Sequence, residues 1–132
     1  KGVLAFDKKT DSGCYIIHST PRFPAEGVSI LPDNEVDYGQ TYLCITLDSY
    51  QAANEIAEVV RTQHEAQVYA SKIPGVGAGE SLAKLAKMDN TPEPKAPSIV
   101  KLKTRGGLDI TFFGKNLSLY FSLQFFHKNE VD

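Results

Sequence analysis

The sequence predicts an α+β fold, in which an α/β-like mixed sheet is flanked by helices. Three observations predict it: short apolar runs separated by Gly- and Pro-containing turns, one stretch of helical periodicity, and a length that fits one domain. The 132 residues, 42% of them hydrophobic and 23% charged, are assigned to a single domain, residues 1–132. No apolar run approaches the roughly 20 residues that a membrane-spanning helix needs. A membrane is therefore not expected among the partners.

Strands are expected where apolar, β-branched or aromatic residues recur between turn residues. These criteria select residues 2–7, 14–19, 41–47, 66–71, 98–104 and 108–113. The polar turn at 7–13 and the turn at 105–107 predict two hairpins. Residues 117–126 suit a central strand or a buried helix, and the alternation of leucines with polar residues favours the strand.

Two helices and two irregular segments complete the expected order. Apolar residues at three- and four-residue spacing predict a helix over 50–64, which Ser49 can cap. A shorter helix is expected over 80–88, after a Gly-rich break. Residues 25–40 have the composition of a loop, and 89–97, with three prolines, that of an internal connector. A sheet with so few helices can expose a face or an edge, which would fit a missing partner segment.

The charge is unevenly distributed along the chain. Residues 26–65 carry eight acidic side chains and one basic one, Arg61, whereas the stretch 95–105 carries only basic ones. The formal net charge of -2 argues against a strongly basic nucleic-acid binder at neutral pH. The basic stretch contains Lys95, Lys101, Lys103 and Arg105. It is interpreted as a solvated strand face or, alternatively, as a stripe that faces phosphates.

Motifs for a metal or a cofactor are not found. Gly75, Gly77 and Gly79 are not followed by the Gly-Lys-Ser of a phosphate-binding loop, and the three histidines have no companion at ligand spacing. Neither a cofactor nor a structural metal is therefore expected. Cys14 and Cys44 lie on expected strands, where a buried free thiol or a disulfide is favoured over a nucleophile.

His18 is the first candidate for chemistry. It ends an apolar strand directly before a Ser-Thr-Pro turn, and strand ends that open into loops are where sheet proteins display catalytic groups. The alternative is a histidine whose ring bonds to the turn backbone. His64 suits a favourable cation at a helix C-terminus, and His127 a surface residue. Asn116 begins an Asn-x-Ser sequon, a feature of secreted glycoproteins.

Three segments, in order and at about the right separations, resemble the deoxyribonuclease II family: Lys1-Gly-Val-Leu-Ala-Phe-Asp7, His18-Ser-Thr-Pro-Arg-Phe-Pro24 and Tyr38-Gly-Gln-Thr-Tyr-Leu-Cys44. Looser matches extend the resemblance over most of the chain. It implies a lysosomal or secreted acid endonuclease that cuts DNA without a divalent metal and leaves 3′-phosphate ends. It also implies a phospholipase D-like architecture, in which two similar halves share one active site and each supplies a His-x-Lys pair.

The resemblance also implies roles for single residues. Lys1 matches the lysine of the first pair, which would hold a non-bridging phosphate oxygen. His18 matches a further histidine, needed for positioning or proton transfer at the same phosphate. Cys44 matches a half-cystine whose partner lies upstream of the given chain, and Cys14 stands where an aromatic residue is expected. Residues expected to bind DNA are Arg22, Lys101, Lys103 and Arg105, and the expected glycosylation site is Asn116.

The sequence departs from the family pattern at the principal histidines. The first would lie two positions before Lys1 and the second pair beyond Asp132, while His127-Lys128 lacks the residue that should separate the two. One interpretation is a piece of a larger or cleaved enzyme, whose partners are DNA and its remaining segments or a partner chain. Another is a catalytically inactive secreted relative that binds nucleic acid or protein. The third is a small secreted interaction domain with only a structural likeness.

Overall fold

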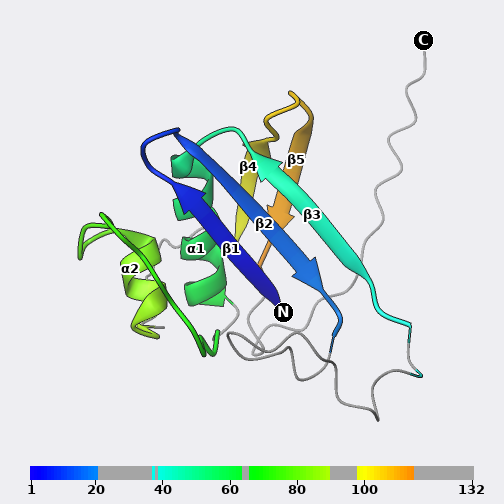
Figure 1. Ribbon diagram of the computed structural model, residues 1–132, viewed down its shortest axis with the longest axis horizontal. Helices are drawn as coiled ribbons and strands as arrows, with labels where there is room; N and C mark the ends of the chain where they lie inside the picture. Colours follow the sequence, from blue (N-terminus) through cyan, green and yellow to red (C-terminus); the bar gives the residue numbers. More distant parts are fainter. Residues whose placement is uncertain (21–36, 38, 64–65, 90–97, 115–132) are drawn as a thin grey trace.

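The computed structural model describes residues 1–20, 37, 39–63, 66–89 and 98–114 (Figure 1). Its elements are β1 (Gly2–Asp7), β2 (Ser12–His18), β3 (Tyr42–Leu47), α1 (Tyr50–Gln63), α2 (Ser81–Ala86), β4 (Ile99–Lys103) and β5 (Asp109–Phe113). The expected α+β class is confirmed. The described strands form two antiparallel sheets, one of order β1-β2-β3 and one made of β4 and β5. A bridge between Leu47 and Thr104 connects the two sheets at one end.

The expected strand at 66–71 is wrong. These residues have no regular secondary structure and are largely exposed, Tyr69 to 66%. A strand needs a neighbouring strand and a face to bury, and residues 66–71 belong to neither of the described sheets. The second helix is shorter than expected, because Met88 adopts a φ of 56 and stops it. Most of the loop 25–40, most of the connector 89–97, His64 and the expected strand 117–126 lie outside the described residues.

The first hairpin and α1 are tied together by short polar side chains. The Asp7 carboxylate accepts hydrogen bonds from the Lys9 N–H and the Thr10 hydroxyl, each of 2.9 Å, which closes the turn. Asp11 in the same turn accepts a 2.8 Å bond from the Tyr50 N–H, in the first turn of α1. Ser49 accepts a bond from the Ala52 N–H at 3.2 Å, which confirms it as the helix cap. The hairpin therefore sets where α1 begins.

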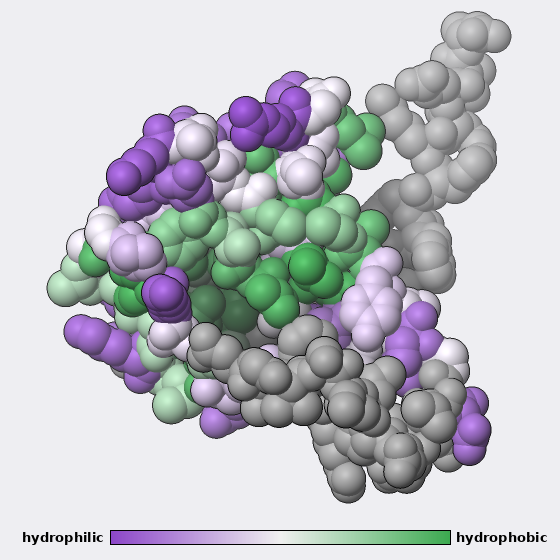
Figure 2. Space-filling model, in the orientation of Figure 1, coloured by the Kyte–Doolittle hydropathy of each residue, from purple (hydrophilic) through white to green (hydrophobic). Residues whose placement is uncertain are grey.

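The core lies between α1 and the inner faces of both sheets. Its buried residues are Tyr15, Leu47, Ala52, Ala53, Ile56 and Leu102. In Figure 1, α1 lies behind the three-stranded sheet and α2 lies to its left, so that the face toward the viewer is not covered by any described helix. Strand alternation places Val3, Ala5, Cys14, Ile16 and Cys44 on that outer face. Figure 2 shows a largely apolar surface there. Of the described helices, neither has the length and apolar character of a membrane span.

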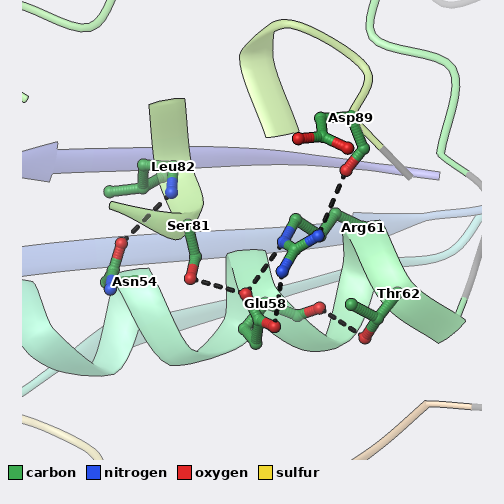
Figure 3. Close-up of polar contacts among 7 residues, drawn as sticks. All are labelled: Asn54, Glu58, Arg61, Thr62, Ser81, Leu82 and Asp89. Carbon is green, nitrogen blue, oxygen red and sulfur yellow. Dashed lines mark hydrogen bonds and ion pairs between the residues drawn. The ribbon is translucent and has the colours of Figure 1, made fainter. Parts of the chain in front are cut away.

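A buried ion pair within α1 also bonds to α2 and to the residues that follow it (Figure 3). Arg61 is only 1% exposed, and its Nη2 and Nε donate to the two carboxylate oxygens of Glu58 at 2.7 and 2.8 Å. The hydroxyl of Ser81, at the start of α2, donates to the same carboxylate at 2.6 Å. Arg61 Nη1 donates to the backbone carbonyl of Asp89 at 3.2 Å. Each of these buried polar groups has a hydrogen-bonding partner among the others, and the cluster therefore holds α2 against α1.

A second polar cluster ties α2 to the first hairpin and to α1. The Glu80 carboxylate accepts bonds from the Tyr50 hydroxyl at 2.5 Å and the Gly77 N–H at 2.6 Å. It also pairs with the Lys8 ammonium at 3.0 Å. These interactions, first of all the bond from Tyr50, lower the pKa of Glu80 to about 2 from its ordinary value of 4.5.

Glu80→Gln is expected to destabilise the fold near neutral pH but not in strong acid. A depressed pKa in the folded state adds stability that is complete above the ordinary pKa of 4.5 and is lost as the pH falls toward 2. Thermal unfolding of the wild type and the variant should therefore differ in Tm at about pH 7 and converge at about pH 2. A Tm difference that stays constant over this range would show that the carboxylate charge contributes nothing.

Candidate active site

Lys1 and His18 lie together at one end of the three-stranded sheet. Lys1 directly precedes β1 and His18 ends β2, and because these strands are antiparallel the two residues meet. The His18 backbone N–H donates to the Lys1 carbonyl at 3.1 Å. The Lys1 ammonium donates to the carbonyls of Thr20 at 2.9 Å and Ser19 at 3.4 Å. A cation is thus held against the segment that follows the candidate histidine.

The two segments that carry the resemblance most specifically also meet here. The Ser19 hydroxyl donates to Gln40 Oε1 at 2.8 Å and accepts a 2.9 Å bond from the Thr41 N–H. The hydroxyls of Thr20 and Tyr42 share a 2.5 Å hydrogen bond. His18 is opposite Tyr42 in the β2–β3 register, and their rings stack with centroids 5.9 Å apart and planes inclined by 22°. We call the group Lys1, His18, Ser19, Thr20, Gln40 and Tyr42 the Lys1–His18 site.

Burial controls the ionisation of the site. The His18 side chain is nearly enclosed, with 6% of the residue exposed, whereas Tyr42 is 57% exposed. Burial lowers the pKa of the His18 imidazole, and the positive charge of Lys1 lowers it further. Both effects disfavour imidazolium. A phosphate placed beside Lys1 would offset the positive charge and raise the pKa of His18 again.

The participation of Thr20 and Tyr42 was not anticipated from the sequence. Thr20 is fully buried, and its hydroxyl holds that of the exposed Tyr42. Both residues belong to segments that carry the family resemblance, and this was the signal in the sequence that could have pointed to them. Their contact depends on pairing between β2 and β3, which lie on either side of a long connecting segment, so local sequence patterns do not reveal it.

The described residues of the basic stretch, Lys101, Lys103 and Arg105, lie away from the Lys1–His18 site. Arg105 donates its backbone N–H to the Thr46 carbonyl at 3.0 Å, near the Leu47–Thr104 bridge. Tyr42, beside His18, lies at the other end of β3, four residues from Thr46, which is roughly 13 Å at about 3.3 Å per residue. Lys103 forms a 2.9 Å ion pair with Asp109, which is the main cause of the raised pKa of Lys103.

Lys101 shares an open groove with acidic side chains. The groove is lined by residues of α1, β4 and β5 and by the two residues before α1, and its charged residues are Asp48, Glu55, Lys101, Lys103 and Asp109. The structure therefore does not bring the basic stretch to the Lys1–His18 site. Arg22 and Asn116 lie outside the described residues. Among the residues the structure does describe, no group of three or more His, Cys, Asp or Glu side chains is arranged to hold a metal ion.

These observations define an α+β domain that presents an ammonium and an imidazole at one end of its sheet. The chain belongs to the deoxyribonuclease II family, whose model matches residues 1–127. It is 32% identical over 116 residues to a putative deoxyribonuclease-2 of Burkholderia pseudomallei, covering 88% of this chain and 32% of the relative.

Two animal relatives show similar sequence identity and coverage. Plancitoxin-1 of Acanthaster planci is 34% identical over 119 residues, which are 87% of this chain and 32% of that protein. Deoxyribonuclease-2-alpha of Rattus norvegicus is 32% identical over 120 residues, which are 87% of this chain and 33% of that protein. The chain thus spans about a third of the length of the curated relatives it matches.

Proposed function

We propose that this chain is part of an acid endonuclease that hydrolyses DNA phosphodiesters to 3′-phosphate ends without a divalent metal. The observation that carries the proposal is that Lys1 and His18 are hydrogen-bonded through their backbones, with the Lys1 ammonium on the carbonyls that follow His18, where the two most family-specific segments meet. Family membership and the names of the relatives support a nuclease as the general class.

Lys1 would stabilise charge on the phosphoryl group. A lysine ammonium has three N–H donors, and in this structure the carbonyls of Ser19 and Thr20 accept from two of them. The third can donate to a non-bridging phosphate oxygen. Because the cation is already oriented, little reorganisation is needed as negative charge develops in the transition state.

His18 would position the phosphate or transfer a proton at it. In the chemistry that the resemblance implies, one histidine of the two His-x-Lys pairs attacks phosphorus while the other protonates the leaving 5′-oxygen. Water then attacks the phosphohistidine and releases the 3′-phosphate. His18 is neither of these histidines. Its ring stacks on Tyr42 and burial lowers its pKa, so it is suited to bonding a phosphate oxygen once the substrate anion raises that pKa.

An acid-active enzyme of this kind would work in a lysosome or outside the cell, and we propose that location. Histidines that must carry a proton favour a pH below the usual imidazole pKa of about 6.5. The Asn116 sequon supports the same location, since Asn-x-Ser sites are glycosylated in secreted proteins.

A plasmid-nicking assay in EDTA tests the proposal. The full-length protein should convert supercoiled plasmid to the nicked form at about pH 5 and much more slowly at about pH 7.5, because its histidines lose their protons in between. Ends produced at acid pH should carry 3′-phosphates. Cleavage that requires magnesium, or that is fastest at neutral pH, would refute the mechanism, and absence of cleavage would favour the inactive binding module.

The basic stretch is proposed to bind the DNA backbone away from the scissile phosphate. If so, Lys101→Ala combined with Lys103→Ala should weaken binding of duplex DNA and reduce the slope of log affinity against log salt by up to about 2. The exposed pair Lys72→Ala with Lys87→Ala changes the net charge equally and serves as the control. An unchanged slope would mean that Lys101 and Lys103 only balance the acidic side chains of their groove.

A further inference from the structure

The two cysteines of the chain lie side by side on the outer face of the sheet. Their Sγ atoms are 3.4 Å apart. Cys14 of β2 is paired with Thr46, and Cys44 of β3 is paired with Ile16, so that the cysteines occupy diagonal positions on one face. The paired residues Tyr15 and Ile45 lie between them, so the strand register sets the positions of the two cysteines. Cys44 is exposed and Cys14 is half-buried.

We propose that Cys14 and Cys44 form a disulfide that links β2 to β3. The family resemblance instead implies that Cys44 pairs with an upstream cysteine, and that an aromatic residue stands at position 14. In this chain a thiol at position 14 lies against Cys44. Diagonal neighbours lie about 7–8 Å apart, somewhat beyond the usual Cα separation of a disulfide, about 4.4–6.8 Å. Closing the gap from 3.4 Å to the roughly 2.05 Å of a sulfur–sulfur bond therefore requires rotation of the side chains and a small approach of the two strands, with their pairing unchanged.

The bond can form by thiol–disulfide exchange with a small-molecule disulfide as the oxidant. The exposed Cys44 thiolate attacks one sulfur of the oxidant and displaces one small thiol. Cys14 then attacks the Cys44 sulfur of this mixed disulfide and displaces the second small thiol, so two protein thiols are oxidised and one small disulfide is reduced. Burial first, and then the contact with Cys44, raise the pKa of Cys14, which leaves the exposed Cys44 as the thiol that attacks the oxidant first.

The link would hold the strands that build the Lys1–His18 site. Cys44 is two residues from Tyr42 along β3, and both side chains are on the outer face with His18. A covalent tie there limits sliding or separation of β2 and β3, and so keeps His18 opposite Tyr42. The inference requires an oxidising compartment, where disulfides persist, but it does not depend on nuclease activity.

Peptide mapping of the full-length protein tests the inference directly. The protein is secreted from eukaryotic cells, its free thiols are alkylated, and it is digested with trypsin without reduction. Trypsin places Cys14 in peptide 10–22 and Cys44 in peptide 23–61, so the proposed bond joins two separate peptides. We expect a linked species whose mass is the sum of the two peptide masses less two hydrogen atoms. This species should be absent after reduction. Alkylation of both cysteines, or linkage of Cys44 to any other cysteine, would overturn the inference.

A displaced cysteine provides the matched control. Cys14→Ser combined with Ser12→Cys keeps a thiol on β2 and on the same face, but moves it two residues farther from Cys44. In this variant peptides 10–22 and 23–61 should not be linked, and Cys44 should be alkylated. Equal linkage in the variant would indicate that the cysteines pair without the strand register, contrary to the proposal.

Discussion

His18→Asn is expected to reduce plasmid cleavage at acid pH by at least about 100-fold, the scale of a lost proton-transfer or positioning group. Asparagine keeps a polar side chain but cannot exchange a proton, and it does not stack on Tyr42 as the imidazole does. Thermal unfolding should change by no more than a few degrees, because the strand pairing around His18 uses backbone atoms.

The effect must be separated from a structural one. Tyr42→Phe keeps the stacked ring and removes the hydroxyl bonded to Thr20, so it tests packing beside His18 without removing the imidazole. Because the imidazole stays, it should lose far less activity than His18→Asn. If His18→Asn unfolds the protein, or cuts DNA as fast as the wild type, His18 is a histidine of the fold.

Glu58→Gln is expected to destabilise the protein by about 3 kcal/mol, the largest effect on stability that we predict. The substitution keeps the shape of the side chain but leaves the guanidinium of Arg61, 1% exposed, without its counter-charge. It also weakens the bond from Ser81 that holds α2. Urea unfolding of the purified protein measures the loss.

Adding Arg61→Met to Glu58→Gln should recover part of that stability. The methionine removes the buried charge and packs its stem where the arginine stem lay, and buried ion pairs often tolerate such replacement. Coupling of the two substitutions is therefore expected to be about 1 kcal/mol or more. Additive losses from the two single variants would mean that the ion pair contributes no coupling and that the helices are held by apolar contacts.

The parts of the fold that the sequence predicted are those encoded by neighbouring residues. Ser49 precedes an amphipathic stretch, and it caps α1. Gly106 and Gly107 separate two β-branched runs, and these form the β4–β5 hairpin. The strand predicted over 66–71 is wrong, because a strand must also pair with another strand and a local pattern does not show whether it does.

Within the site, single residues were predictable but their arrangement was not. His18 stood out at a strand end, and Lys1 through the family resemblance. Their meeting with Tyr42 depends on the order of strands in the sheet, and tertiary pairing of this kind has no local signature. The ion pair of Lys103 with Asp109 also depends on strand pairing, because it joins facing residues of β4 and β5.

The claim on which the proposal depends is that Lys1 and His18 contact the same phosphate. The most direct measurement is the pKa of His18 by NMR, with and without a dinucleotide whose bridging oxygen is replaced so that it cannot be cleaved. Binding should raise the pKa of His18, because the phosphate offsets the positive charge of Lys1. Lys1→Met should weaken the binding. A pKa of His18 that does not change when the dinucleotide is bound, with equal affinity in Lys1→Met, would contradict the claim.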